Sequence, residues 1–163
     1  MACTMDASAI MNRFMEQAIE LAAASVRTNS GPFAALVVKD GNVVAIGVNQ
    51  VVRANDPTAH AEIVAIREAC RALGDFQLAG CDVYASCEPC PMCLGALYWA
   101  RPARIFFAAT RDDAAAAGFD DALIYREILA PPPERTIPTI HLPHERAGRP
   151  FEEWLNKPDK TKY

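Results

Sequence analysis

Two short motifs with metal-ligand side chains constrain this fold most, because each stands where a helix is expected to begin. The first is His60-Ala61-Glu62, and the second is Pro89-Cys90-Pro91-Met92-Cys93. Apolar spacing predicts an amphipathic helix over 61–73 that ends at Gly74. A proline at its opening indicates a second helix over 91–99. If one metal ion joins the two motifs, the starts of both helices must meet at one point of the fold.

The ligand types indicate zinc. One imidazole and two thiols, from His60, Cys90 and Cys93, are donors that suit Zn²⁺. Three protein ligands leave the fourth tetrahedral position open, which is typical of a catalytic zinc and not of a structural one. Glu62 lies two residues beyond the histidine, where it can reach a reacting water without being a ligand. The positive ends of two helices would also favour the thiolates that zinc requires.

The same cysteines are consistent with two other kinds of site. Cys87 would complete a closed site of three thiolates and one histidine, which would stabilise the fold and do no chemistry. Its place at the end of a predicted strand, before Glu88-Pro89, argues against this closed site. A redox pair made by the two cysteines of the second motif would leave the first motif unexplained.

The other elements predict an α/β fold. The pattern predicts a helix over 10–26, a short helix over 151–155, and strands over 33–39, 43–52, 81–87, 104–110 and 136–142. Asp40-Gly41 indicates an antiparallel hairpin of the first two strands, while the helical crossovers predict parallel pairs after it. We therefore expect a three-layer α/β/α sandwich with a mixed central sheet of roughly five strands, and zinc near the strand ends.

Three consecutive prolines, Pro131-Pro132-Pro133, mark a change in the character of the chain. Such a run is stiff and excludes both helix and central strand. We expect a main domain over 1–130, followed over 131–163 by a Pro-rich linker and a C-terminal segment. That segment has apolar residues of its own, so it is a candidate for exchange between two protomers. The alternative is a tail that folds back on its own subunit.

Charge and composition argue against several classes of partner. The formal net charge is −4 and the isoelectric point is about 5.4, so we expect no broad phosphate-binding surface and no nucleic-acid partner. No stretch has the pattern of a secretory signal or of a transmembrane span, so we expect no membrane partner. Six cysteines, two of them predicted zinc ligands, fit a reducing compartment, and we expect a cytoplasmic protein.

The two motifs together resemble the signature of the cytidine-deaminase-like superfamily, in which His-x-Glu is followed by Pro-Cys-x-x-Cys. Within it the chain is similar to the bacterial guanine deaminases, from Phe14 to Tyr163. The resemblance is carried by Gly31-Pro32-Phe33 and by the runs 55–62, 86–96, 98–102, 117–121 and 162–163. The run 118–121 and the terminal tyrosine look like the guanine branch, whereas the earlier motifs are shared with tRNA adenosine deaminases.

The resemblance implies zinc-dependent hydrolytic deamination of guanine to xanthine and ammonia. It assigns His60, Cys90 and Cys93 as zinc ligands and Glu62 as the proton shuttle. Deamination of tRNA adenosine is the main rival, and cytosine, guanosine and ammeline are further candidate substrates, because pocket shape sets the choice of base. A zinc-stabilised interaction module without catalysis is a rival from another class, against which the presence of Glu62 argues.

Four residues match positions that contact the substrate in this family. Phe33 matches a residue that lines the face of the base, and Asn49 matches one that hydrogen-bonds it. Asp121 matches a second acidic group, which can accept from the ring N–H and amine of guanine and act as a second proton shuttle. Tyr163 matches a terminal residue that closes the pocket of the neighbouring subunit in a swapped homodimer. Each of the four could instead have no part in a site. Phe33 would then be a core residue, Asn49 a turn residue, Asp121 a surface residue and Tyr163 an ordinary chain end.

Overall fold

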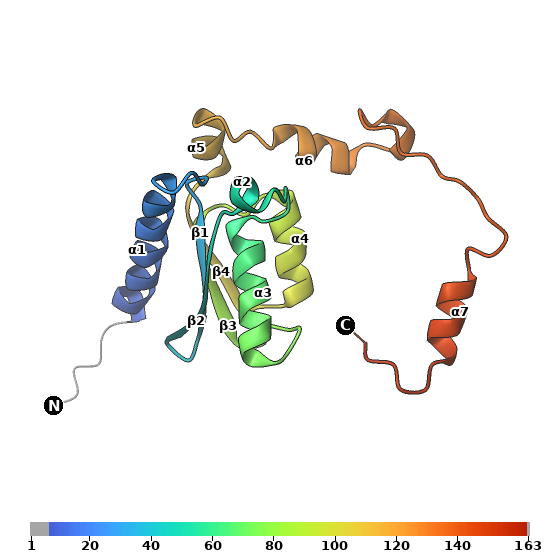
Figure 1. Ribbon diagram of the computed structural model, residues 1–163, viewed down its shortest axis with the longest axis horizontal. Helices are drawn as coiled ribbons and strands as arrows, with labels where there is room; N and C mark the ends of the chain where they lie inside the picture. The colour runs from blue at the N-terminus through green and yellow to red at the C-terminus, as the bar shows by residue number, and fades with distance from the viewer. Residues whose placement is uncertain (1–6, 163) are drawn as a thin grey trace. The chain divides into compact units, whose positions relative to one another are not determined.

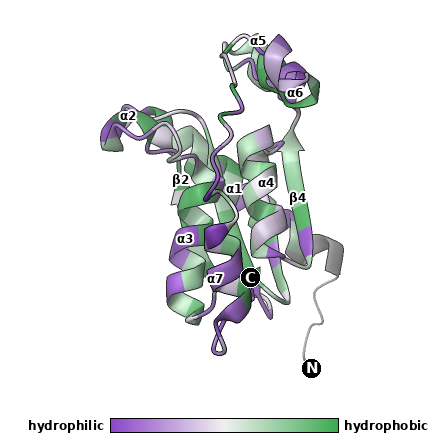
Figure 2. Cartoon of the chain, turned by 90° about the vertical axis from the view of Figure 1, so that its right-hand side faces the viewer, coloured by the Kyte–Doolittle hydropathy of each residue, from purple (hydrophilic) through white to green (hydrophobic). Residues whose placement is uncertain are grey.

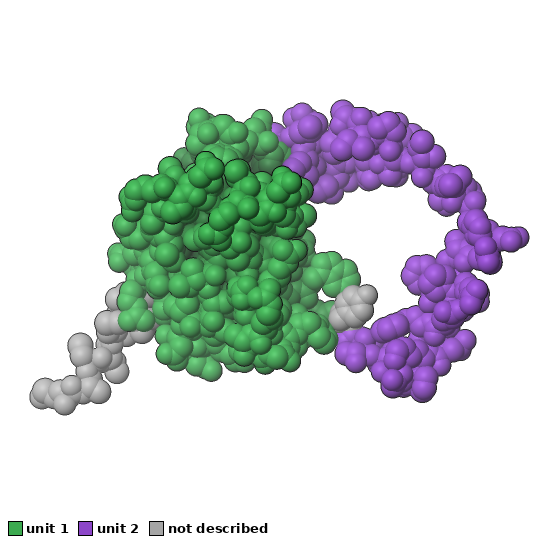
Figure 3. All heavy atoms as spheres, viewed as in Figure 1, with its two compact units in different colours: residues 1–121 green, residues 122–163 purple. Residues whose placement is uncertain are grey.

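The computed structural model of the protein describes residues 7–162 and divides the chain into two compact units, which Figure 3 colours separately. Unit 1 is Met1–Asp121 and unit 2 is Ala122–Tyr163. The boundary thus precedes the Pro131-Pro132-Pro133 run at which the sequence suggests one. No helix in the described part of the chain is long and apolar enough to cross a membrane.

A mixed sheet of four strands forms the middle of unit 1. In the order in which they lie in the sheet, the strands are β2 (Asn42–Val48), β1 (Ala34–Lys39), β3 (Cys81–Cys87) and β4 (Arg104–Ala109). The antiparallel β1–β2 hairpin and the parallel β3–β4 pair are confirmed. The parallel pair expected of β2 and β3 does not form, and β3 pairs antiparallel with β1 instead. The reason is that β1 lies between β2 and β3, so the crossover joins two strands that do not pair.

Helices cover both faces of the sheet, which confirms the three-layer α/β/α sandwich (Figure 1). The helix α1 (Ala7–Val26) lies on one side, where Phe14 and Ala18 pack with apolar side chains of β1 and β3. The helices α3 (Ala61–Leu73) and α4 (Pro91–Ala100) lie on the other side. Every residue of β1 except its last is buried, as expected for a strand that is covered on both faces.

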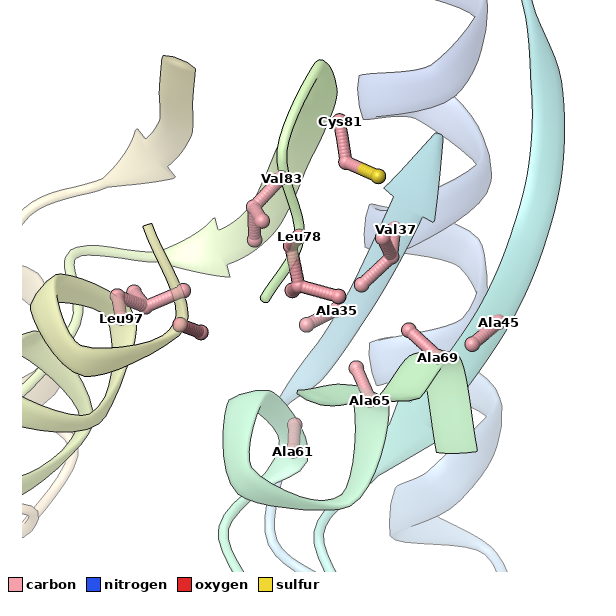
Figure 4. Close-up of a cluster of buried hydrophobic side chains, with 11 residues drawn as sticks. Ala35, Val37, Ala45, Ala61, Ala65, Ala69, Leu78, Cys81, Val83 and Leu97 are labelled. Atoms are coloured by element: carbon pink, nitrogen blue, oxygen red, sulfur yellow. The ribbon is translucent and has the colours of Figure 1, made fainter. Parts of the chain in front are cut away.

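Small residues let α3 approach the sheet closely. Ala61, Ala65 and Ala69 lie four positions apart on one face of the helix and point into the buried cluster shown in Figure 4. Facing them on β2 is Gly47, where a Cβ atom would stand 2.0 Å from the carbonyl oxygen of Ala61 and 2.5 Å from the amide nitrogen of Ala65. Since no side chain fits there, Gly47 sets the height of α3 above the sheet, and with it the position of the first turn of α3.

The sheet has four strands, and the expectation of roughly five was wrong. Residues 136–142 form no strand, because Pro138 lacks an amide hydrogen for a ladder and no neighbouring strand accepts the segment. Beyond β4 the described part of the sheet has no further strand, although Figure 2 shows most of β4 as hydrophobic. Phe107 on this strand is consequently 48% exposed.

The second strand is shorter than predicted, and the reason lies in Asn49. The sequence favours a strand over 43–52, whereas β2 ends at Val48 and Val51–Ala54 forms the short helix α2. The side-chain Oδ1 of Asn49 accepts the amide hydrogen of Val51 at 3.2 Å. This local bond competes with the sheet ladder and turns the chain out of the sheet just before the His60 motif.

The remaining helices lie after β4. In unit 1, α5 (Arg111–Ala116) begins with a capping box made by Thr110 and Asp113. Unit 2 contains α6 (Ala122–Leu129), a 3-10 turn over Pro132–Glu134 and α7 (Arg149–Asn156). The short helix expected over 151–155 lies inside α7.

Candidate metal centre and substrate site

Three potential metal ligands come together where two helices begin. His60 is the N-cap residue of α3, Cys90 is the N-cap residue of α4, and Cys93 lies in the first turn of α4. The Nδ1 atom of His60 lies 3.5 Å from the Sγ atom of Cys90 and 3.5 Å from that of Cys93. All three ligand atoms lie within 4.8 Å of one another. The two helix starts therefore meet at one point of the fold.

The spacing of these atoms fits zinc. Bonds of about 2.0–2.1 Å to nitrogen and about 2.3 Å to sulfur, at a tetrahedral angle, separate the two kinds of ligand by about 3.6 Å. The observed nitrogen–sulfur separations of 3.5 Å are close to that value. One imidazole and two thiols are also ligands that zinc prefers. The three side chains can thus hold Zn²⁺ with little rearrangement.

Hydrogen bonds among these side chains shift the pKa values of the two thiols in opposite directions. Hydrogen bonds from Cys93 and from His60 lower the pKa of Cys90 to about 4. The pKa of Cys93 is raised, first because its thiol donates to Cys90 and then because it is buried. The hydrogen bond with Cys90 likewise raises the pKa of His60. A divalent cation would replace these shared protons, so metal binding and proton release are coupled at this site.

Cys87 stands apart from the three ligands. Its Sγ atom donates to the carbonyl oxygen of Thr110 at 3.5 Å, and burial raises the pKa of its thiol. Among the described residues, the group suited to a metal contains His60, Cys90 and Cys93 but not Cys87. The geometry therefore favours a site with three protein ligands and an open position over a closed site with four.

Glu62 lies beside the ligands in the first turn of α3. Its side chain is only 8% exposed, and burial is the main cause that raises the pKa of its carboxyl group. The nearby charge of Cys90 raises this pKa further, while a hydrogen bond with Cys93 lowers it. A raised pKa makes the carboxyl group hold a proton more readily than an ordinary carboxylate, so that it can both accept and donate one, as a shuttle must.

Gly31 lies in the loop before β1, and the side chains of Phe33 and Asn49 both lie close to it. A Cβ atom on Gly31 would stand 3.3 Å from a ring carbon of Phe33 and 3.4 Å from the side-chain Cγ of Asn49. The amide nitrogen of Asn49 donates to the carbonyl oxygen of Phe33 at 3.1 Å. Because Oδ1 of Asn49 accepts from Val51, the orientation of the side-chain amide is set and its NH₂ group points elsewhere.

Asp121 ends unit 1 close to the metal ligands. Burial raises the pKa of its carboxyl group, and the charge of Cys90 raises it further. Two residues earlier, the ring of Phe119 meets the ring of Phe33 edge to face, with 4.9 Å between centroids. Phe119 was not predicted as a site residue, although it stands in the run 117–121 that carries the resemblance. Tyr163 lies outside the described residues.

Comparisons with known proteins agree with this site. Residues 9–109 match the family described as the cytidine and deoxycytidylate deaminase zinc-binding region. Guanine deaminase of Bacillus subtilis is 52% identical over 151 residues, which cover 92% of this chain and 97% of that protein. A tRNA-specific adenosine deaminase of Agrobacterium fabrum is 44% identical over 96 residues, which cover 59% of this chain and 63% of that protein.

The likeness extends to solved structures. The X-ray structure of guanine deaminase from Bacillus subtilis superposes with a TM-score of 0.92 at 52% sequence identity, over 93% of this chain and 98% of that one. The matched family region, 9–109, contains all three ligands and Glu62. The chain belongs to the cytidine and deoxycytidylate deaminase zinc-binding family.

Proposed function

We propose that this protein is a zinc-dependent enzyme that hydrolyses guanine to xanthine and ammonia. One observation carries the proposal: the buried carboxyl group of Glu62 lies beside three zinc-suited ligands, His60, Cys90 and Cys93. The chain that holds this arrangement is 52% identical to a guanine deaminase over 92% of its length.

The proposed mechanism moves the protons of one water molecule to the base through a carboxyl group. Zinc held by the three ligands supplies a Lewis acid that makes water a nucleophile near neutral pH. Glu62 accepts a proton from the attacking water and delivers it to the ring nitrogen beside C2. Water oxygen adds at C2, the carbon that carries the amine. Glu62, or Asp121 as a second shuttle, then takes the proton of the hydroxyl group now on C2 and delivers it to the amine. The C–N bond breaks, ammonia leaves, and C2 becomes the carbonyl carbon of xanthine.

The residues around Gly31 suit a flat purine. The ring of Phe33, braced by Phe119, offers an aromatic surface for stacking. The NH₂ group of Asn49 can donate to an acceptor on the base. The carboxyl group of Asp121 can accept from the ring N–H and the amine of guanine. Tyr163, at the chain end, is proposed to close the pocket of a neighbouring subunit.

A panel of substrates tests the proposal directly. Ammonia release is measured from guanine, guanosine, adenine, cytosine and ammeline under the same conditions, with the zinc content determined on the same sample. Guanine should have the highest kcat/KM. A higher value for any other compound of the panel would replace guanine with that compound as the substrate.

Deamination of adenosine in tRNA is the second candidate function. It is favoured by the 44% identity to a tRNA-specific adenosine deaminase, which covers 59% of this chain. The net charge of −4 opposes it, because RNA binding depends on neutralising phosphates. Tight tRNA retention at low salt, with affinity that falls steeply as salt rises, would favour this function over guanine deamination.

We further propose a homodimer whose C-terminal segments are exchanged. No residue between 122 and 162 is buried, and Leu129, Leu142 and Phe151 are 85%, 86% and 72% exposed. Exposed apolar side chains on this scale are typical of a segment that packs on another surface. A second copy of the chain is the proposed partner, as the stiff Pro131-Pro132-Pro133 run and the resemblance suggest.

The cytoplasm is the proposed compartment. The five described cysteines are free thiols, and two of them must stay reduced to bind zinc. A reducing environment meets this requirement.

A further inference from the structure

Two serine hydroxyl groups hold the backbone of the residues proposed to contact the base. We infer that Ser25 and Ser30 are positioning residues that set where Phe33 and Asn49 meet the substrate. The inference rests on the proposed function, because it treats Phe33 and Asn49 as the residues that contact the base. Neither serine belongs to the metal centre or to the motifs that carry the resemblance.

Ser25 joins the end of α1 to the loop that carries Phe33. Its side chain is only 5% exposed, and Oγ lies 2.7 Å from the carbonyl oxygens of both Ala22 and Gly31. The Gly31 carbonyl also accepts the amide hydrogen of Phe33 at 2.8 Å. The single hydroxyl proton of Ser25 is shared between these two carbonyl groups, so the Gly31 carbonyl accepts both from Ser25 and from Phe33. The hydroxyl of Ser25 is the described link that fixes this carbonyl to α1.

Ser30 provides a second anchor on the opposite residue. Its Oγ donates to the carbonyl oxygen of Asn49, across nineteen positions of the chain. Asn49 in turn donates its amide hydrogen to the carbonyl oxygen of Phe33. Phe33 and Asn49 are therefore paired by their backbones. Ser30 bonds Asn49 itself, and Ser25 bonds the Gly31 carbonyl that accepts from Phe33.

The packing at Gly31 leaves little room for these side chains to drift. A Cβ at Gly31 would already be in tight contact with both Phe33 and Asn49, so the loop lies directly against them. The NH₂ group of Asn49 can reach a base only if the backbone of this loop keeps its position. Misplacement of binding groups by about 1 Å can cost up to about 100-fold in kcat/KM, even when the cause lies far from the chemistry.

The expected kinetic effect is on KM. Residues that hold the base bind it equally before and during the reaction, so their misplacement raises KM and leaves kcat nearly unchanged. Ser25→Ala and Ser30→Ala should each raise KM about 2- to 12-fold, the range expected when one anchoring hydrogen bond is lost. Zinc content should stay at the wild-type level, because neither serine contacts the ligands.

Conservative variants and a matched control separate positioning from general stability. Ser30→Thr keeps the hydroxyl and should restore KM, and Ser25→Cys keeps the volume with a weak donor and should give an intermediate KM. Thr28→Val is the control, because Thr28, in the turn just after α1, donates from Oγ1 to the carbonyl oxygen of Ser25 at 2.8 Å. This variant also loses a hydroxyl bond in the same loop, and it should lower the melting temperature without changing KM.

Double-mutant cycles show whether the serines act through the proposed partners. Ser25→Ala is combined with Phe33→Ala, and Ser30→Ala with Asn49→Ala. The effect of each serine on KM should shrink several-fold in the combined variant, because its target side chain is gone.

Several outcomes would overturn the inference: unchanged KM in both alanine variants, full additivity in both cycles, or a loss confined to kcat. If Ser25→Ala does not fold, Ser30→Ala, whose side chain is less buried, decides the question. KM is measured for whichever base the wild-type enzyme deaminates best. Failure of guanine as the substrate would therefore remain distinguishable from failure of the positioning role.

Discussion

Burial distinguishes Glu62 from Glu68, the other carboxylate of α3. Glu62 is 8% exposed and its pKa is raised by loss of hydration, whereas Glu68 on the same helix is exposed and paired with Arg71. The difference follows from helical periodicity, because position 62 faces the metal ligands and position 68 faces solvent. A buried carboxyl group without a lasting ion pair is costly to keep in a fold. Its presence beside three metal ligands is therefore best explained by proton transfer.

Glu62→Gln should retain zinc and fold but lose about 10²–10⁴-fold in kcat. The amide has almost the same shape as the carboxyl group and cannot carry a proton between water and base. Steady-state ammonia release, metal analysis and circular dichroism check these three properties. Glu68→Gln is the matched control and should behave as wild type. Turnover of Glu62→Gln within a few-fold of wild type would remove this residue from the mechanism.

The cysteines allow an equally direct test of the metal site. Cys90→Ser should lose zinc, whereas Cys87→Ser should keep one zinc per chain, because the Cys87 thiol bonds to Thr110 and not to the ligand group. X-ray absorption of the wild-type protein should show two sulfur ligands and at least one nitrogen. Three sulfur ligands would show that Cys87 joins a closed structural site.

At the scale of elements, the contact between β2 and α3 determines where the site forms. The alanine stripe of α3 meets the sheet at Gly47, whose missing side chain allows the backbones to touch. His60 and Glu62 lie at the start of the same helix. Any change that lifts α3 from the sheet therefore moves His60 and Glu62, the proposed metal ligand and the proposed proton shuttle, together.

Gly47→Ala should lower the free energy of unfolding by about 1–3 kcal/mol, the usual cost of forcing an extra methyl group into a packed core. It should also weaken zinc binding, since the new Cβ would have to displace the backbone at Ala61 and Ala65. Gly95→Ala in α4 is the control. No atom lies within 4 Å of its future Cβ, so this helical position should gain about 0.5–1 kcal/mol. Denaturant melts and zinc titration compare the two variants, and equal effects would contradict a special role for Gly47.

At the scale of the whole molecule, the two units differ in how they bury apolar side chains. Unit 1 has two buried clusters, one on each face of its sheet. In the described part of unit 2, α6 and α7 have no buried residue at all. A segment with exposed leucine, isoleucine and phenylalanine side chains is not expected to be stable alone in water. This contrast motivates the exchanged dimer.

Mixing two inactive variants tests that exchange. One variant is Glu62→Gln, and the other lacks residues 154–163, which should leave zinc bound but admit water to the pocket. In an exchanged dimer, one hybrid site has both an intact Glu62 and an intact tail. Random mixing should then restore about a quarter of the wild-type activity, because about half of the dimers are hybrids with one complete site of two. Dimers that are shown to have mixed and yet stay inactive would show that each tail serves its own subunit.

Much of the fold could be predicted because its signals are local. Periodic apolar residues, the ending Gly74 and the opening Pro91 define α3 and α4 within a residue of their observed bounds. Ligand chemistry singled out the three side chains whose ligand atoms lie within 4.8 Å of one another. These features depend on neighbours in the chain, so composition and spacing are enough to read them.

Contacts between distant residues were decided only by the tertiary structure. The antiparallel pairing of β1 with β3, the ring contact of Phe119 with Phe33 and the close approach at Gly47 each join segments that no periodicity relates. The side chain of Asn49 ended β2 early because its bond to Val51 competed with strand propensity. The amino-acid sequence by itself determined α3 and α4, two of the three strand pairings and the zinc chemistry. The tertiary structure determined which of those parts meet, because the free energy of such contacts depends on packing that exists only once the chain has folded.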